Sequence, residues 1–438
     1  MENIKSNQKK SNMQKVALTA LAGTSIEWYD FFLYGAAAAL IFPTAFFGEM
    51  PPTTALLLSL LTFAAGFIAR PIGGIIFGHF GDKVGRKKTL ISALMLMGIS
   101  STLIGLLPTY AMIGVAAPIL LTTLRFAQGL AIGGQWGGAM LLVTESAPSD
   151  QRGYYGAFAQ AGAPIGVILA NLALIITSAL VSEEFFNTWG WRIPFLASAV
   201  LILISMYIQL NLEDTDAFKA LTNNKDTQSN ENIQKSPVVV AIRKYPKRIF
   251  LAAGAFLSVQ VTFYILIAFM LAYGVTSANM ARDDMLAAVL IASAIMVPIQ
   301  FIFSSYSDRN GRKGIFMLGA VLTGIWAFAI FPLVDTGNFY LIVLAITGGL
   351  IFLAMMYGPQ AAFFTELFST EVRYSGATLG YQFGAIVGGA FAPTIAVKLW
   401  TEFDIIWVSA YIALASLLTL LSVMALTETY QSDLNNTD

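Results

Sequence analysis

The feature of this chain that most limits its fold is a series of apolar stretches, each about 20 residues long. A stretch of this length crosses a hydrocarbon core of about 30 Å as an α-helix. Only 11% of the 438 residues are charged, whereas a soluble domain carries roughly 25%, and the period-two alternation of a membrane β-barrel is not found. We therefore predict an all-α integral membrane protein with twelve transmembrane helices. The expected spans are residues 16–45, 54–80, 89–108, 112–144, 153–180, 190–212, 245–276, 284–306, 314–333, 338–366, 373–398 and 404–427.

The rest of the composition excludes several classes of function. The chain has no cysteine and a single histidine, His79, so disulfides, thiolate chemistry and a histidine-based metal site are not expected. Its 25 basic and 25 acidic residues balance, which gives no reason to expect a nucleic-acid partner. No nucleophile–base set indicates an enzyme, and the chain lacks the phosphate-binding loop motif of ATP-driven proteins. We expect no cofactor and no metal.

The distribution of lysine and arginine predicts the orientation in the membrane. With the N-terminus inside, most basic residues fall in cytoplasmic segments, and only Arg282 and Lys398 fall in outer loops. Both termini are then cytoplasmic, as an even number of spans requires. The first 15 residues are polar and basic and lack the cleavage pattern of a signal peptide, so we expect a cytoplasmic tail at 1–15.

Two pairs of similar loop motifs indicate that the chain consists of two repeated halves. "GHFGDKVGRKKTL" after the second span resembles "SSYSDRNGRKGIF" after the eighth, and "TESAPSDQRG" resembles "TELFSTEVRYSG" at nearly the same spacing. Parallel repeats with a substrate site between them are common in secondary transporters. We expect six-helix bundles at 16–212 and 245–427, a cytoplasmic linker at 213–244 and a cytoplasmic tail at 428–438.

The loops that contain these similar motifs also hold the residues expected to form a gate. Gly81 and Gly85 permit a tight turn, Asp82 could pair with Arg152, and Arg86 could reach the carboxylate of Glu145. Such pairs would hold the cytoplasmic side shut in the outward-facing state. The alternative is a solvated basic loop that only fixes the topology. The predicted gating residues are Gly81, Asp82, Gly85, Arg86, Glu145, Arg152, Asp308, Arg312, Glu366 and Arg373.

These motifs resemble those of a known superfamily. "GDKVGRKK", its weaker copy "SDRNGRKG", and "RFAQG" resemble the major facilitator superfamily. "IEWYDFFLYG", "RPIGGIIFGHFGDKVGRKK", "GGQWGGAMLLVTESAP" and "WGWRIPF" resemble the metabolite:H+ symporter family, which includes proline/betaine, α-ketoglutarate, citrate and shikimate permeases. The resemblance spans almost the whole chain. One departure is Gln135, where close relatives often have the carboxylate of Glu.

Two acids stand in the first span, in "GTSIEWYDFFLYG". Glu27 and Asp30 lie near the membrane midplane and, three residues apart, share one helix face with Tyr34. A carboxylate at this depth costs about 2.5–3.5 kcal/mol, so it is retained only where it is paired or takes a proton. Desolvation favours its protonated form. We predict that one or both carry protons; the alternative is a permanent salt bridge.

Two arginines, Arg70 and Arg125, lie within spans two and four and balance the two acids. When an acid takes a proton, an arginine is freed to hold a substrate carboxylate through bidentate hydrogen bonds, so proton and anion bind together. Arg192 lies near the outer end of span six, where interfacial anchoring and substrate contact are equally plausible.

The second half carries no charge in its spans but offers amide and phenol groups, including Gln260, Gln300 and Tyr381. Such groups bind substrate hydroxyls, or else join neighbouring helices. The predicted substrate-binding residues are Tyr34, Arg70, Arg125, Gln128, Gln135, Trp136, Gln160, Tyr264, Tyr357, Gln360 and Gln382.

The residues and the resemblance together predict a proton-coupled symporter of the bacterial cell membrane that imports a small organic acid or zwitterion by alternating access. Its expected partners are the substrate, protons and the lipid bilayer, and we expect a monomer. The alternative mechanism is proton-driven export of an amphipathic compound, which would favour a larger, mostly aromatic cavity with isolated acids. A membrane sensor would need an appended signalling domain, and no segment outside the membrane exceeds about 35 residues.

Overall fold

The computed structural model describes residues 2–84, 86–133, 140, 143–213, 237–369 and 372–430. These residues form helices and connecting turns, with no strand among them. Ten of the helical segments are long and apolar enough to cross a membrane. Helices α1 (Glu2–Leu40) and α4 (Arg86–Leu106) complete a set of twelve. The predicted twelve-helix membrane fold is confirmed, and the helix ends lie within a few residues of most expected span ends.

The first half consists of six long helices with short helices at their ends. Its long members are α1, α3 (Pro52–Val84), α4, α6 (Ala116–Gly133), α8 (Arg152–Leu180) and α10 (Ile193–Glu213). The short helices are α2 (Phe42–Phe47), α5 (Tyr110–Ile113), α9 (Glu183–Thr188) and the 3-10 turn η1 (Gly190–Arg192). Helix α1 begins at Glu2, so the segment expected as a polar tail continues the first span as helix.

The second half repeats this arrangement with two interrupted spans. Its elements are α12 (Pro237–Lys244), α13 (Pro246–Tyr264), η2 (Ile265–Phe269), α14 (Met270–Thr276), α15 (Arg282–Asn310), α16 (Arg312–Val334), α17 (Phe339–Glu366), α18 (Arg373–Gly384), η3 (Ala385–Ala390), α19 (Ala392–Glu402) and α20 (Ile405–Ala425). The segments η2 and η3 are π-helical turns within the seventh and tenth spans. π-Turns of this kind occur frequently at functional sites.

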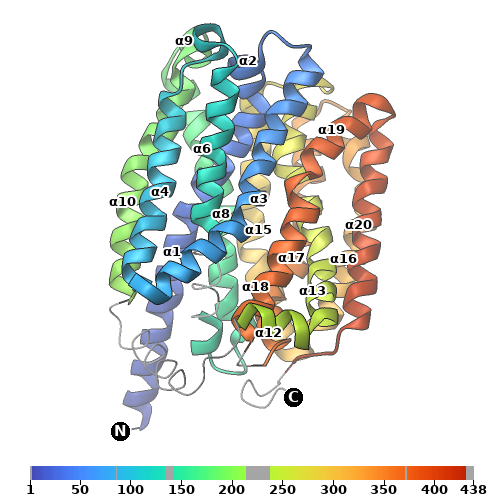
Figure 1. The fold of residues 1–438 in the computed structure, drawn as a ribbon. Helices are drawn as coiled ribbons and strands as arrows, with labels where there is room; N and C mark the ends of the chain where they lie inside the picture. The colour runs from blue at the N-terminus through green and yellow to red at the C-terminus, as the bar shows by residue number, and fades with distance from the viewer. Residues whose placement is uncertain are drawn as a thin grey trace.

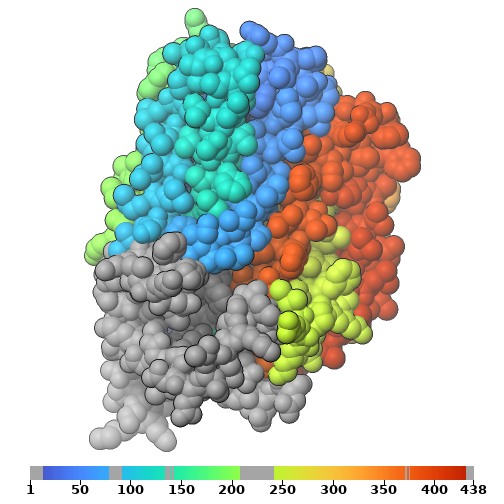
Figure 2. Space-filling view, in the orientation of Figure 1, coloured from blue at the N-terminus to red at the C-terminus, as the bar shows by residue number. Residues whose placement is uncertain are grey.

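The two halves stand side by side, and α1 begins at the same end of the bundle at which α20 finishes (Figure 1). We call this end the terminal end, and the opposite end, which carries α2 and α9, the distal end. Figure 2 shows blue-to-cyan atoms of the first half in contact with orange atoms of the second half in the upper and middle part of the molecule. Across this boundary α8 packs against α15 and α17, and α3 packs against η3.

Glycine residues allow α3 and α6 to approach closely. A Cβ atom on Gly129 would lie 2.1 Å from the carbonyl oxygen of Gly66, and one on Gly133 would lie 1.9 Å from that of Arg70. Since any larger side chain would push the helices apart, these backbones are in direct contact. The contact places Arg70 of α3 and Arg125 of α6 in the interior of the first half.

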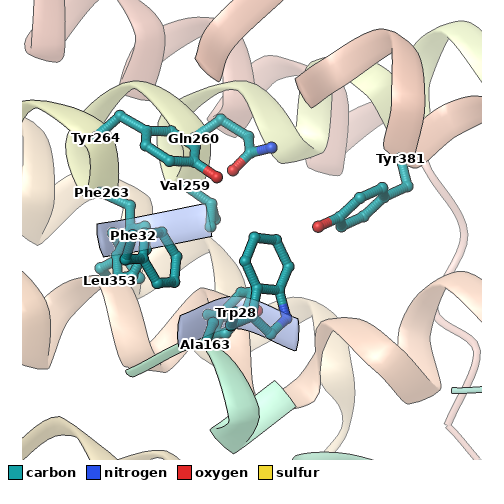
Figure 3. Close-up of a pocket in the computed structure, with 10 residues that line it drawn as sticks. Trp28, Phe32, Ala163, Val259, Gln260, Phe263, Tyr264, Leu353 and Tyr381 are labelled. Atoms are coloured by element: carbon teal, nitrogen blue, oxygen red, sulfur yellow. The ribbon is translucent and has the colours of Figure 1, made fainter. Parts of the chain in front are cut away.

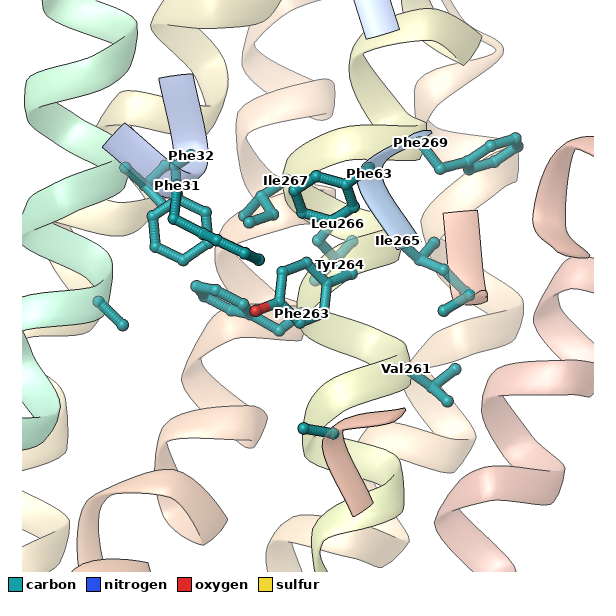
Figure 4. Packing of buried hydrophobic residues seen from close by; sticks show 14 of the residues in the cluster. Phe31, Phe32, Phe63, Val261, Phe263, Tyr264, Ile265, Leu266, Ile267 and Phe269 are labelled. Carbon is teal, nitrogen blue, oxygen red and sulfur yellow. The ribbon is translucent and has the colours of Figure 1, made fainter. Parts of the chain in front are cut away.

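The core of the protein is continuous through both halves. At its centre, aromatic rings of α1 and α3 meet rings of α13, and Figure 4 shows Phe31, Phe32, Phe63 and Tyr264 gathered at this point. The ring centroid of Tyr264 lies 5.7 Å from that of Phe63 and 6.1 Å from that of Phe31, in edge-to-face geometry. This arrangement is the favoured one for aromatic pairs, and it fills the space between the halves at mid-depth.

Candidate functional site

Asp30 lies inside the first half, at the junction of α1 with α4 and α10. Its side chain is 2% exposed. Its Oδ1 atom accepts a hydrogen bond from the Ser198 hydroxyl of α10, and Ser101 of α4 lies beside the same carboxyl group. The Oδ2 atom has no hydrogen-bond partner within the described part of the chain. Glu27, one turn earlier, is only partly buried, so the two predicted proton carriers occupy different environments.

A short polar chain leads from Asp30 toward Arg125. The Arg125 Nη1 atom donates to Gln128 Oε1 at 3.0 Å, and Gln128 Nε2 donates to Ser101 Oγ at 2.7 Å. No ion pair within 4.0 Å joins Asp30 to Arg70 or Arg125 among the described residues. Asp30 therefore reaches Arg125 through Ser101 and Gln128, without a direct ion pair between the two in the described structure.

The two arginines are surrounded by aromatic rings. The Arg125 guanidinium carbon lies 4.2 Å from the ring centroids of Phe31 and Tyr34, and 4.7 Å from that of Phe63. The Tyr34 hydroxyl bonds to Thr62 at 2.6 Å. These contacts place the predicted residue Tyr34 beside Arg125, where cation–π attraction offsets part of the cost of burying the charge.

Arg70 lies closer to the boundary between the halves. Its guanidinium carbon lies 4.4 Å from the ring centroids of Phe31 and Phe67, and 5.5 Å from that of Trp28. The Tyr264 hydroxyl of the second half is within hydrogen-bonding reach of it. The Nε and Nη2 atoms of both arginines are buried and have no hydrogen-bond partner in the described structure. Buried donors of this kind are rarely left unpaired, so four N–H-bearing atoms are open to an acceptor.

A small cavity lies between the halves (Figure 3), and its wall includes Trp28 and Tyr264, which contact Arg70. Its volume is about 10 Å³, which is close to the minimum that holds one water molecule. Among the residues that the structure describes, no charged side chain lines it. The lining residues are Trp28, Phe32, Ala163, Val259, Gln260, Phe263, Tyr264, Leu353, Tyr357 and Tyr381. A solute enters this space only after the halves separate.

The cavity wall overlaps only in part with the predicted substrate-binding set. Tyr264 and Tyr357 line it, as do Gln260 and Tyr381, which the sequence had indicated as polar groups of the second half. Sequence reasoning missed Trp28 and the other apolar lining residues. The available signal was their position: Trp28 and Phe32 are four residues apart, on a different face of the first span from Glu27 and Asp30.

Other predicted residues lie outside the cavity wall. Gln160 donates from Nε2 to the Tyr357 carbonyl at 3.2 Å, which joins the two halves. Gln360 and Gln382 are buried and carry side-chain amide atoms without partners within the described chain. Gln135 and Trp136 fall outside the described residues.

Arg192 has a structural position. It donates from Nη1 to the carbonyl oxygens of Gly105 at 3.0 Å and Leu107 at 2.5 Å, and its guanidinium lies over Trp191. These carbonyls end α4, where the helix leaves its last acceptor groups unpaired. The sequence left interfacial anchoring and substrate contact open for Arg192; the structure places it against the end of α4, outside the cavity wall.

Acidic and basic residues of both halves form a cluster at the terminal end. In the second half, Arg312 donates from Nη1 to Asp308 Oδ1 at 2.6 Å and from Nη2 to Glu366 Oε1 at 3.1 Å. Asp308 also accepts from the first half, from the backbone N–H groups of Gly153 at 2.8 Å and Tyr154 at 2.7 Å. We call this cluster, together with the ion pairs in the next paragraph, the terminal latch.

Two further ion pairs of the terminal latch cross between the halves. Arg373 of the second half lies 3.5 Å from Glu145, and Arg152 lies 3.9 Å from Glu366. The corresponding pairs expected in the first half cannot be compared, because Gly85 and the side chains of Asp82 and Arg86 fall outside the described residues. Gly81 lies within α3 as helix, not in the tight turn expected for it.

A second polar contact between the halves lies at the distal end. Arg282 of α15 donates from Nη2 to Ser178 Oγ of α8 at 3.0 Å, and its guanidinium lies 4.1 Å from the ring centroid of Phe186. Ser178 in turn donates to Asp283 Oδ2 at 2.9 Å. We call this group the distal clamp. In the described part of the chain, side-chain contacts thus join the two halves at both ends.

The matches to known proteins agree with this geometry. The sequence profile described as Major Facilitator Superfamily matches residues 20–378, well over half of the chain. The chain belongs to the Major Facilitator Superfamily. The predicted superfamily is thus confirmed, and with it the prediction of a transport protein and not an enzyme.

Named relatives in this superfamily cover almost the whole chain. The inner membrane metabolite transport protein YhjE of Escherichia coli K12 is 39% identical over 431 residues, covering 97% of this chain and 96% of that protein. The shikimate transporter of the same organism is 37% identical over 405 residues, 92% of each chain. The proline/betaine transporter of Salmonella typhimurium is 31% identical over 428 residues, 95% of this chain and 84% of that protein.

Solved structures of the Major Facilitator Superfamily confirm the fold. The proton:xylose symporter XylE, bound to 6-bromo-6-deoxy-D-glucose, is 17% identical and has a TM-score of 0.72 over 98% of each chain. XylE from E. coli in a partially occluded inward-open conformation has a TM-score of 0.69 at 17% identity, over 96% of this chain and 99% of that one. The chain is a multi-pass membrane protein with this two-half architecture.

Proposed function

We propose that this protein is a proton-coupled symporter of the bacterial plasma membrane that imports a small organic acid or zwitterion by alternating access. The single observation that carries the proposal is the pair of buried arginines, whose Nε and Nη2 atoms have no acceptor among the described residues. A substrate carboxylate supplies acceptors in bidentate geometry. The relatives named as shikimate and proline/betaine transporters move solutes with that group.

Proton coupling follows from the position of Asp30. Its buried carboxyl group reaches Arg125 through Ser101 and Gln128. Protonation removes the negative charge that balances the arginines, and the interior then carries an uncompensated positive charge that favours an anion. Loss of the proton restores the balance and weakens anion binding. Proton and substrate therefore bind together and leave together. Glu27, partly buried one turn away, is the second candidate for the proton site.

The orientation of the cycle follows from the basic residues. With both termini in the cytoplasm, the terminal latch is the cytoplasmic gate and the distal clamp faces the outside. Opening either one while the other stays closed gives the two access states.

Proton-driven export of an amphipathic compound remains a second candidate because the cavity wall is mostly aromatic. Two cationic groups beside a cavity without acids fit an anion better than the cationic compounds that acidic drug-binding sites attract.

Uptake into proteoliposomes tests the proposal. The purified protein is reconstituted, an inward proton gradient is imposed, and accumulation of radiolabelled organic acids and betaines is measured with and without a protonophore. We expect accumulation that depends on the gradient, and a reduction of at least about tenfold in Asp30→Asn. Glu402→Gln, an exposed acid at the distal end, is the control. Accumulation that is unchanged by the protonophore would refute symport. Release of a preloaded compound that depends on the proton gradient would favour export.

A further inference from the structure

The buried carboxyl group of Asp30 is held by a hydroxyl group of a neighbouring helix, that of Ser198 on α10. Ser198 is fully buried, and its Oγ atom donates a hydrogen bond to Asp30 Oδ1. It lies between one and two turns after the start of α10 at Ile193. Because Asp30 is the proposed proton carrier, the hydrogen bonds that Ser198 can make affect how the proton is held.

Close packing of α4 against α10 fixes Ser198 in this place. Phe195, Ser198 and Ile202 share one face of α10. A Cβ atom on Gly98 of α4 would lie 2.7 Å from the Ile202 side chain, and one on Gly105 would lie 3.0 Å from that of Phe195. The backbone on both sides of Ser198 is thus held against α4, and the hydroxyl hydrogen is the part of the residue that remains free to turn.

The Ser198 hydroxyl has two acceptors within reach. One is Asp30 Oδ1, and the other is the carbonyl oxygen of Pro194, one turn earlier on α10 and 3.4 Å from Ser198 Oγ. A hydroxyl has one hydrogen to donate, but its oxygen also accepts hydrogen bonds. An ionised carboxylate is the stronger acceptor, so the hydrogen turns to Asp30 while Asp30 is charged. Once Asp30 is neutral, the hydrogen can turn to Pro194, and Ser198 Oγ is then open to accept.

The same geometry determines which oxygen of Asp30 carries the proton. Asp30 Oδ2 has no hydrogen-bond partner among the residues that the structure describes. A proton on Oδ2 would be a buried donor without an acceptor, which is unfavourable. A proton on Oδ1 instead faces Ser198 Oγ, which accepts the hydrogen bond when its own hydrogen has turned to the Pro194 carbonyl.

Ionisable groups around the Asp30 carboxyl group come from several helices. Arg125 of α6 acts on it, and Arg70 of α3 contacts the ring of Phe31, the next residue of α1. On α1 itself, Glu27 lies one turn earlier, and the adjacent Tyr29 donates from its hydroxyl to the Pro194 carbonyl at 2.9 Å. From α4 and α10 the facing groups are uncharged serine hydroxyls. Helix α8, also packed on α1, has its single charged residue at its terminal end, Arg152.

From this arrangement we propose that Ser198 is a positioning residue for proton coupling, which donates to Asp30 when Asp30 is ionised and accepts from it when Asp30 is protonated. In the second state the incoming proton is on Asp30 Oδ1 and is donated to Ser198 Oγ, while the Ser198 hydrogen is donated to the Pro194 carbonyl. No bond of Ser198 breaks, because its O–H group only turns. Asp30 then has a hydrogen-bond partner in both states, although it is buried. The inference rests on the proposed function and adds to it a residue that holds the proton without carrying it.

The pH dependence of uptake into proteoliposomes tests this role. Ser198→Ala removes the hydrogen bond in both states, but the bond to the charged carboxylate is the stronger one, so the protonated state gains. We expect the pH of half-maximal uptake to rise by about one unit, a tenfold change in proton affinity. Ser198→Thr keeps the hydroxyl group and should restore the wild-type profile. Ser409→Ala, which removes a buried hydroxyl bonded to the Ala327 carbonyl in the second half, is the control.

Infrared difference spectroscopy of the purified protein observes the protonated acid without any transport. The carbonyl stretching band of protonated Asp30 is the one that Asp30→Asn removes. We expect this band to move to higher wavenumber in Ser198→Ala, because the acid loses its hydrogen-bond acceptor, and to stay in place in Ser198→Thr. Ser198→Cys, whose thiol is a weaker donor and acceptor, should give intermediate shifts in both measurements.

The outcomes separate this role from the proposed function. An unchanged or lowered pH of half-maximal uptake in Ser198→Ala, or an unchanged Asp30 band, would overturn the role of Ser198 while wild-type uptake still depends on the proton gradient. Wild-type uptake that is unaffected by a protonophore would instead refute symport itself.

Discussion

Arg70 and Arg125 share one aromatic ring: their guanidinium carbons lie 4.4 and 4.2 Å from the ring centroid of Phe31. Two like charges this close in a low-dielectric interior repel each other. Each guanidinium contacts the electron-rich face of this ring, which offsets part of that cost. Phe31 therefore stabilises two buried cations of like charge.

Replacement of Phe31 tests this role. Phe31→Leu keeps an apolar side chain but removes both cation–π contacts, so we expect the free energy of unfolding to fall by about 1–3 kcal/mol. Thermal unfolding in detergent measures the loss. A saturating transported anion should recover more stability in the variant than in the wild type, because it neutralises the charges that Phe31 no longer shields. Phe269→Leu, a buried ring that stacks on Tyr273 and not on a cation, is the control.

Gln128 connects Arg125 to Ser101, which lies beside Asp30, the proposed proton carrier. Gln128→Leu removes both of its hydrogen bonds and leaves Arg125 with a further unpaired donor. We expect gradient-driven uptake to fall by about tenfold or more, and its pH dependence to flatten, because protonation of Asp30 no longer acts on Arg125 through this chain. Initial uptake rates between pH 5 and 8 measure the effect. A profile with the wild-type shape would place the coupling elsewhere.

The terminal latch depends on Glu366, which accepts from Arg312 at 3.1 and 3.3 Å and from Thr429 at 2.8 Å. Glu366→Gln leaves Arg312 with one carboxylate, Asp308, and should favour opening at this end. Since the chain has no cysteine, a single Ala361→Cys behind the latch reports opening by maleimide labelling. We expect labelling at least about fivefold faster in Glu366→Gln, an equilibrium shift of about 1 kcal/mol.

Glu402→Gln is the matched control for this labelling experiment, because its ion pair with Lys398 is exposed at the distal end. Equal labelling rates in the two variants would show that Glu366 does not hold the latch closed.

Glu428 follows α20 and connects it to the terminal latch. Its carboxylate accepts from the backbone N–H groups of Arg312 at 3.0 Å and Lys313 at 2.9 Å, at the start of α16. Gly311, with φ of 97°, makes this approach possible, since a Cβ atom there would lie 2.9 Å from the carboxylate. Partial burial raises the pKa of Glu428, but four backbone hydrogen bonds outweigh it and hold the pKa below its ordinary value.

The lowered pKa of Glu428 predicts the direction in which its contribution to stability changes with pH. The contribution of Glu428 to stability is present above its ordinary pKa near 4.3 and is lost as the pH falls through the lower folded value. Glu428→Gln should cost about 1 kcal/mol at pH 7, as other losses of a helix cap do. As the pH falls through the lowered folded pKa of Glu428, the wild type and the variant should converge in thermal stability. A constant difference down to pH 3 would contradict the assignment.

The distal clamp predicts a crosslink that stops transport. Ser178 and Asp283 belong to opposite halves and their side chains are 2.9 Å apart. In the double variant Ser178→Cys, Asp283→Cys, a short bifunctional methanethiosulfonate reagent should join the halves and reduce uptake by about tenfold or more. A reductant should restore uptake. Each single variant is a control, and undiminished uptake in the crosslinked protein would show that this end does not open.

Local sequence features were sufficient to predict much of the fold. The twelve spans follow from the length of the apolar stretches, because a helix in lipid makes all of its backbone hydrogen bonds internally. The two halves follow from the pairs of similar loop motifs. The ion pairs Arg152–Glu366 and Arg373–Glu145 of the terminal latch join residues that belong to these motifs. The start of α1 at Glu2 was not predicted, since a polar segment gives no apolar signal of its own.

The composition of the cavity wall was harder to predict. Gln160, Gln360 and Gln382 have the residue types expected of a binding site, yet they lie outside the wall. Trp28 and Phe32 form part of it, although apolar rings in an apolar helix carry no distinguishing pattern. Which face of each helix meets the centre depends on its rotation, and the π-helical segments η2 and η3 alter that rotation beside Tyr264.

Apolar length, charge and repetition are properties of the chain, so they were enough to predict two repeated membrane-spanning bundles with acids and arginines in the spans of the first. The connection from Asp30 to Arg125 through Gln128, and the contacts that join the halves at both ends, became visible in the folded protein alone. These relationships depend on contacts between helices distant in sequence, whose rotation and approach are set by side-chain packing and by glycine contacts such as that between Gly66 and Gly129.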